Sequence, residues 1–141
     1  MGIDFGERRT GVALSDPTGT LASPLQTLER RAGRRLPLKA LEEIARANDV
    51  TELVVGVPFD LRGEETEWTQ RVRAAGAELA CRLEIPVAYV DERFSSVRAQ
   101  RAVRSAGLPK GERERKDRVD RAAAALILQD WLDRRSAGGA P

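Results

Sequence analysis

Histidine is absent from this chain of 141 residues. Its absence excludes the commonest general base, the commonest zinc ligand and every Ser-His or Cys-His nucleophile. The single cysteine, Cys81, cannot form a disulfide within the chain, and we expect it to be buried on an apolar helix face. Catalytic chemistry must therefore use carboxylates, hydroxyls and arginine, and any metal would be a hard ion such as Mg²⁺ or Mn²⁺.

Aromatic residues and long apolar runs are also scarce. Aromatics are 4% of the chain, too few to form a platform on which nucleic-acid bases stack. The runs "AAAALIL" and "LVVGVP" are far shorter than the ~20 residues of a membrane span, and no leader precedes the first strand. We therefore expect a cytoplasmic protein without a membrane partner, with a single domain at 1–135 and a flexible tail at 136–141.

Arginine supplies nearly all of the positive charge, since the only lysines are Lys39, Lys110 and Lys116. The net charge is only +2, but the arginines are clustered. Arginine binds phosphate through a planar fork, so such clusters favour a polyanionic partner, although a GC-rich genome would give the same excess. The clusters are Arg30, Arg31, Arg34 and Arg35; Arg98, Arg101 and Arg104; and Arg113, Arg115, Lys116, Arg118 and Arg121.

The apolar pattern changes along the chain from a period of two residues to one of 3.6. Early strands separated by turns with Gly or Pro indicate an antiparallel meander. The later segments alternate between helices and buried strands. We expect strands at 1–5, 10–16, 22–28, 52–59 and 87–90, helices at 37–49, 67–83, 95–107 and 117–135, and a mobile charged loop at 108–116.

This order of elements, βββαβαβαα, is typical of ribonuclease H-like α/β folds. It predicts a five-stranded mixed sheet. Three strands form the antiparallel meander, two further strands are parallel, and helices cover both faces of the sheet.

Acidic residues occur at three separate places in this predicted fold. Asp4 lies in the middle of the first strand, Asp91 and Glu92 follow the fifth strand, and Asp117 and Asp120 begin the last helix. If the first and fifth strands are close, these carboxylates meet at one edge of the sheet. A divalent cation would then offset the cost of burying Asp4.

Each of these acids also has a simpler interpretation. Asp4 could form an Asx turn with Gly6, whose small size would otherwise open the backbone to a phosphate. Asp91 or Glu92 could mark the point where a strand meets water, and Asp120 could be an acid favoured by the helix dipole. The three signals occur together and in the expected order, which favours the shared site.

The segments that carry these signals resemble the YqgF/RuvX family, whose members are described as Holliday junction resolvases and as nucleases that mature the precursor of small-subunit ribosomal RNA. The resemblance implies an acidic site of Asp4, Glu92 and Asp120, with Arg9, Arg93 and Ser95 as accessory or phosphate-contacting residues. Family members usually carry a few more residues before the first strand, so we expect an upstream start or a compensating neighbouring segment. The similar segments are "GIDFGERRTGVALSD", "VVGVPFDLRGEE", "DERFSS" and "VDRAAAALILQDWL".

A two-metal mechanism would suit such a site, because two Mg²⁺ or Mn²⁺ ions can activate water and neutralise the scissile phosphate without histidine. We expect Asp4 to bridge both ions, Glu92 and Asp120 to complete their coordination, and Asp117 or Asp91 to be a further ligand. The partner would be structured RNA or branched or single-stranded DNA, bound by a monomer or homodimer. The expected nucleic-acid contacts are Arg9, Arg93, Ser95, Arg98, Arg101, Lys110, Arg113, Arg115 and Lys116.

Two other classes of function compete with the nuclease. One is a ribonuclease H-like module that binds RNA or ribosomes without cutting. The other is an actin-like phosphate-binding domain, which also begins with an apolar strand and Asp-x-Gly but needs a second such strand and turn. "YVDERF" lacks the glycine, which disfavours the actin-like alternative.

Overall fold

A computed structural model describes residues 1–30, 35–94 and 113–138, with the side chains of 94 and 113–119 left out. Its sheet and helices match the predicted order of elements over this part of the chain. The strands are β1 (Gly2–Phe5), β2 (Arg9–Ser15), β3 (Ala22–Glu29), β4 (Leu53–Val57) and β5 (Val87–Asp91). The helices are α1 (Leu38–Ala47), α2 (Glu67–Leu83), the short 3₁₀ turn η1 (Glu92–Phe94) and α4 (Arg113–Ser136).

The five strands form one mixed sheet in the order β3-β2-β1-β4-β5. β1 pairs antiparallel with β2, and β2 with β3, whereas β4 runs parallel to both β1 and β5. This arrangement confirms the predicted meander plus two parallel strands. It also makes β1 the central strand, so the carboxyl ends of β1, β4 and β5 lie at the same edge of the sheet.

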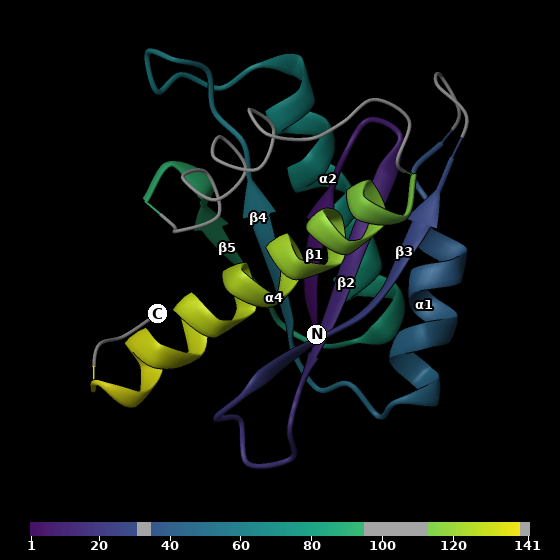
Figure 1. Ribbon diagram of the computed structural model, residues 1–141, viewed down its shortest axis with the longest axis vertical. Coiled ribbons are helices and arrows are strands. Elements are labelled where there is room, and N and C mark those ends of the chain that lie inside the picture. Colours follow the sequence, from purple (N-terminus) through teal and green to yellow (C-terminus); the bar gives the residue numbers. More distant parts are fainter. Residues whose placement is uncertain (31–34, 95–112, 139–141) are drawn as a thin grey trace.

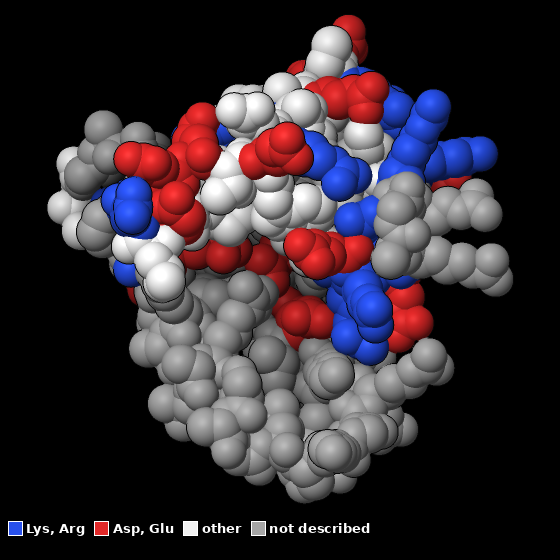
Figure 2. Space-filling model, turned by 90° about the horizontal axis from the view of Figure 1, so that it is seen from above, with Lys and Arg blue, Asp and Glu red and all other residues white. Residues whose placement is uncertain are grey.

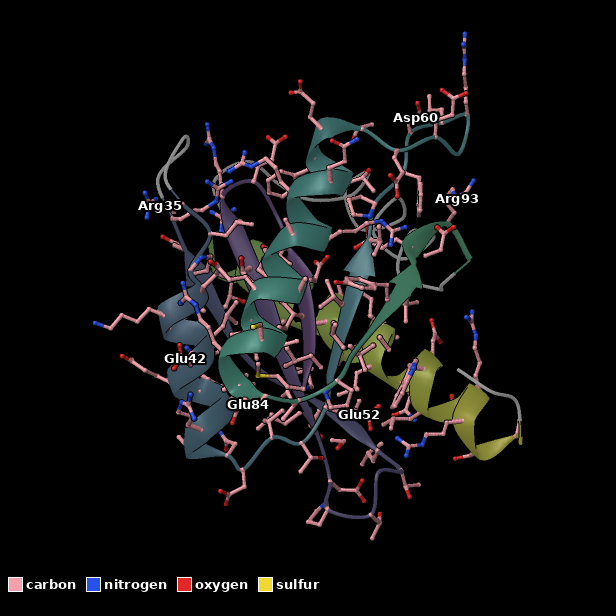
Figure 3. All side chains as sticks on the ribbon, turned by 180° about the vertical axis from the view of Figure 1, so that it is seen from behind. Arg35, Glu42, Glu52, Asp60, Glu84 and Arg93 are labelled. Atoms are coloured by element: carbon pink, nitrogen blue, oxygen red, sulfur yellow. The ribbon has the colours of Figure 1, made fainter. Side chains whose placement is uncertain are left out.

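Two apolar clusters, one on each face, hold the helices to the sheet. α1 and α2 cover one face and α4 crosses the other, as the front and back views show (Figures 1 and 3). Side chains alternate along β1: Ile3 and Phe5 join the α1–α2 cluster, so Asp4 points to the α4 face. None of the helices in the described ranges is long and apolar enough to cross a membrane.

α4 begins four residues before its predicted start, at Arg113 instead of Asp117. The prediction of a charged loop up to residue 116 was therefore wrong at its C-terminal end. After Gly111 the sequence contains no glycine or proline until the helix ends, and Arg, Glu and Lys are strong helix formers. The rest of that loop and the helix predicted at 95–107 lie outside the described residues.

Cys81 is exposed, contrary to the prediction that it is buried. In α2 the buried stripe follows Val72, Ala75 and Leu79, at the spacing of one helix face. Cys81 is two positions after Leu79 and lies outside that stripe. Apolar neighbours in sequence therefore did not report its exposure.

The turn between β2 and β3 is organised by Asp16. Its carboxylate accepts hydrogen bonds from the backbone N–H of Thr20 (2.7 Å) and Leu21 (3.0 Å) and from the Thr18 hydroxyl. The bonds from Thr18, Leu21 and Thr20 lower the pKa of Asp16 from 3.8 to about 2. The ionised carboxylate thus stabilises this turn, in the manner of an Asx turn.

We expect the contribution of Asp16 to stability to depend on pH below neutrality. Its pKa is lower in the folded state than in the unfolded state, so the contribution is complete well above pH 3.8 and lost as the pH falls below about 2. Urea unfolding of wild type and Asp16→Asn at pH 6 and pH 2 checks this. The difference in stability should shrink at pH 2, and an equal difference at both values would contradict the assignment.

Candidate active site

Asp4 is buried in the central strand, with 2% of its surface exposed. It pairs with Gly11 of β2, and the register of β1 with β4 places Gly56 beside it on the other side, because Ile3 pairs with Val55. Strand alternation puts all three residues on the face that α4 covers. A carboxylate in this position is therefore flanked on both sides by residues without side chains.

The other predicted acids lie beside the two flanking glycines. A Cβ added at Gly56 would lie 2.9 Å from Glu92 Oε1, and one added at Gly11 would collide with the backbone carbonyl of Asp120. Glu92 thus lies over β4, and the turn of α4 that carries Asp120 lies over β2, on either side of Asp4. The structure brings together the regions of Asp4, Glu92 and Asp120, which are remote in sequence.

The glycines also have a purely structural role. A Cβ at Gly2 would meet Ala124 and Leu128, and one at Gly56 would also lie 2.5 Å from Ile127 Cδ1. Glycine therefore lets α4 approach the backbone of the sheet closely. In α4, Ala124, Ile127 and Leu128 are buried against Ala13, Val54 and Val90, which fixes Asp120 one turn earlier in the helix.

Gly6 is explained by the turn and not by an open approach to phosphate. Its N–H donates to the carbonyl of Arg9 (2.8 Å), and a Cβ at this position would collide with that carbonyl. The turn leads into Arg9, which lies on the α4 face with Gly11 and has its Nε 3.6 Å from Glu29 Oε1. Arg9 is therefore on the same face as Asp4, as a phosphate contact requires.

Asp91 and Arg93 bind each other on either side of Glu92. Arg93 donates to both carboxylate oxygens of Asp91, with Nη2 2.6 Å from Oδ2, and its backbone N–H donates to Oδ1 (2.9 Å). Burial opposes ionisation of Asp91, but the bonds from Arg93 outweigh it and lower the pKa of Asp91. The same bonds raise the pKa of Arg93. We call this pair, with its chelated η1 turn, the Asp91–Arg93 clasp.

The clasp is attached to the loop that follows β4. The Arg93 guanidinium lies 4.7 Å from the centroid of the Phe59 ring, and a Cβ at Gly63, which has a φ of +80°, would collide with its Nη1. Figure 3 shows Arg93 and Asp60 at the same corner of the molecule. Because its backbone N–H, Nε and Nη2 donate to Asp91, Arg93 ties the two ends of the turn that carries Glu92. Asp91 accepts all of these bonds from Arg93, and its role as a further metal ligand stays a prediction.

Several predicted site residues cannot be placed. The predicted nucleic-acid contacts Ser95, Arg98, Arg101 and Lys110 lie outside the described residues. The backbone of Arg113, Arg115, Lys116 and Asp117 belongs to α4, but their side chains are outside the described part. Their roles stay predictions.

The donors around Asp4 are carboxylate oxygens, which Mg²⁺ and Mn²⁺ prefer. Among the described side chains, no three Asp, Glu or Cys residues are grouped so that they alone could hold an ion. Mg²⁺ commonly keeps several waters and is held by one or two carboxylates together with substrate phosphates. Asp4, Glu92 and Asp120 therefore suit an ion shared with a phosphate better than a pre-formed cage.

The fold and the converging acids define this chain as a ribonuclease H-like domain with a candidate carboxylate site. The model of the family described as "RuvX: Holliday junction resolvase" matches residues 1–134, and the chain belongs to this family. A relative from Clavibacter sepedonicus named "Putative pre-16S rRNA nuclease" is 40% identical over 100% of this chain and 86% of its own length. One of the same name from Roseiflexus sp. is 43% identical over 94% of this chain and 92% of its own.

Two solved structures have a fold similar to that of this chain. The structure described as "T. thermophilus RuvC in complex with Holliday junction substrate" superposes with a TM-score of 0.57, covering 96% of this chain and 93% of that one. The structure of Thermus thermophilus RuvC superposes with a TM-score of 0.54. Their sequence identities are 18% and 17%, so these similarities concern the fold alone.

Reasoning from the sequence missed two features of the site: the flanking glycines and the clasp. Gly11 and Gly56 stand inside apolar strand segments, and a glycine inside a strand signals close approach of another group. That signal was available in "TGV" and "VVGVP". The clasp had no such signal, because it depends on the chain turning into a 3₁₀ conformation at Glu92, directly after β5.

Proposed function

We propose that this chain is a divalent-metal-dependent nuclease that hydrolyses phosphodiester bonds. The expected substrate is the precursor of 16S rRNA, as the names of the curated relatives suggest, and we expect the cut to lie near the 5′ end of the mature RNA. A branched DNA intermediate such as a four-way junction is the second candidate, supported by the description of the family.

The observation that carries the proposal is the burial of Asp4 between two glycines that bring Glu92 and Asp120 to it. A buried carboxylate is costly unless a cation or several donors compensate it. A module that only bound nucleic acid would gain nothing by placing acids beside phosphates, which repel them. A site that takes up cations with its substrate explains why three acids gather there.

In this proposal Asp4, Glu92 and Asp120 hold the metal. Bound Mg²⁺ or Mn²⁺ would neutralise charge on the scissile phosphate and make water a stronger nucleophile. The protein orients Glu92 through the Asp91–Arg93 clasp and Asp120 through the packing of α4. Arg9, on the same face, would contact a phosphate next to the scissile one.

Cleavage assays with end-labelled rRNA precursor, single-stranded DNA and a four-way junction test the proposal. With Mg²⁺ or Mn²⁺, wild type should cut at least one substrate, and EDTA should stop it. Asp4→Asn should lower the rate about 10²–10³-fold, because a neutral amide would hold a divalent cation more weakly than the carboxylate does, while binding of the nucleic acid persists. Asp133→Asn, which changes an exposed acid in the same way, should cut like wild type.

The alternatives give different results in the same assay. A folded wild type that binds all three substrates and cuts none of them would contradict the nuclease and favour the binding module. The preferred substrate separates rRNA processing from action on DNA junctions.

A further inference from the structure

Two arginines from different elements meet at one tryptophan at the end of the sheet where Asp4 lies. Arg30 follows β3, and Trp68 and Arg71 lie in the first turns of α2. Cζ of Arg30 is 5.7 Å and Cζ of Arg71 5.3 Å from the centroid of the Trp68 ring, within the range of cation–π contact. Trp68 itself packs against the core under α1 and α2, so the ring is a fixed support for both cations.

The two guanidinium groups are close enough to affect each other. Burial and the charge of Arg71 lower the pKa of Arg30, and Glu7 offsets this only in part. A guanidinium stacked on a ring keeps its in-plane N–H groups available for bidentate binding of a planar or tetrahedral anion. An anion that bridges Arg30 and Arg71 would relieve their repulsion, and a phosphodiester has the required charge and oxygen geometry.

The cluster of Arg30, Trp68 and Arg71 lies at the same end of the sheet as Asp4 but on the opposite face. The backbone N–H of Arg30 donates to the carbonyl of Arg8 (2.8 Å), within the turn that follows β1. Arg9 points to the α4 face with Asp4, whereas Arg30 and Trp68 are on the α1–α2 face. Seen from above, basic side chains gather mainly on the side where β3 ends (Figure 2), and Arg35 lies on the opposite side of this end from Arg93 (Figure 3).

We propose that Arg30, Trp68 and Arg71 form a phosphate clamp that holds the backbone of the nucleic-acid substrate where it leaves the active site over the turn between β1 and β2. The inference rests on the proposed function. The clamp binds phosphate and recognises no base. The two arginines cover the Trp68 ring, so the ring positions them and does not stack on a base. The clamp therefore takes RNA and DNA strands alike.

Binding measured without cleavage tests the clamp. Anisotropy of labelled rRNA precursor and four-way junction would be titrated at several salt concentrations in EDTA. Arg71→Ala should weaken binding about 3–10-fold and reduce the salt slope by about one, as expected for one lost phosphate contact. Arg135→Ala is the matched control, because it removes an arginine stacked on Trp131 (5.1 Å) in the second half of α4 and should bind like wild type.

Two further comparisons make the test specific. Arg71→Lys keeps the positive charge but loses the planar guanidinium that binds phosphate through two N–H groups. Its affinity should therefore lie between that of Arg71→Ala and that of wild type. With substrates shortened from the 5′ or the 3′ side, one truncation should weaken wild type and abolish the difference between wild type and Arg71→Ala. Equal binding by Arg71→Ala and wild type, or equal losses in Arg71→Ala and Arg135→Ala, would overturn the clamp.

Failure of the clamp and failure of the proposed function are distinguishable. If wild type cuts its substrate but Arg71→Ala binds normally, the clamp is wrong and the nuclease stands. If wild type binds through Arg71 but cuts no substrate, the nuclease is wrong and the clamp stands as part of a binding surface.

Discussion

Cleavage by Gly56→Ala is expected to fall about 100-fold although the variant still folds, because small displacements of a catalytic group have effects of this size. The new Cβ would lie 2.9 Å from Oε1 and 3.3 Å from Cγ of Glu92, and 2.5 Å from Cδ1 of Ile127. These atoms belong to side chains that can rotate, so the backbone need not move. Glu92, however, must leave its position beside Asp4.

Single-turnover cleavage and thermal unfolding of the same preparation measure the two effects. Overpacking should cost about 1–3 kcal/mol of stability. Gly76→Ala is the control, since its Cβ would also make close but less severe contacts, with Tyr89 (3.2 Å) and Val55 (3.3 Å), on the other face of the sheet. That variant should cut like wild type, and wild-type cleavage by Gly56→Ala would contradict the placement of Glu92.

Asp91→Ala and Arg93→Ala are expected to lower cleavage to a similar extent, about 10–100-fold, and the double variant to be no worse than either. Each single change breaks the clasp and leaves η1 free to turn Glu92 away, so the second change removes nothing more. A metal ligand at position 91 and a phosphate contact at position 93 would instead give losses that multiply.

A double-mutant cycle in both rate and unfolding free energy measures this coupling. The pair is about a quarter exposed, with 30% of the Arg93 side chain and 24% of the Asp91 side chain accessible, and we expect the effects of the two single changes not to add. Glu42 and Arg46, an exposed pair on α1, are the control. Their removal should change stability by less than about 1 kcal/mol and leave cleavage unchanged. If the losses of cleavage rate in Asp91→Ala and Arg93→Ala multiply in the double variant, Asp91 would be a metal ligand and Arg93 a phosphate contact.

Local pattern was sufficient for most of the fold. The change of period after residue 35, and the apolar run of β4, predicted the meander and the parallel strand in their correct order. The start of α2 follows from its capping box, in which the side chains of Thr66 and Thr69 each accept a hydrogen bond from the other's backbone N–H. The start of α4 was predicted late because a dense charge run was read as a loop, although its residues favour helix.

The acids of the site could be predicted, but their geometry could not. A lone Asp in a central strand is unusual enough to stand out by itself. The partnership of Asp91 with Arg93 depends on the chain turning into a 3₁₀ conformation directly after β5, and the pairing of Arg30 with Arg71 at Trp68 depends on how β3 and α2 are placed in space. Such contacts between elements are set by packing, and no periodicity in the sequence reports them.

The position of Asp4 separates the site into a rigid part and an adjustable part. Asp4 lies on β1, which has hydrogen-bonded neighbours on both sides, so its backbone can shift only if the sheet opens as a whole. Glu92 lies beyond the end of the edge strand β5, on one turn of 3₁₀ helix to which the Asp91–Arg93 clasp belongs. Evolution could thus retune the reach of Glu92 toward substrates of different width by changing that turn alone, without disturbing the central strand.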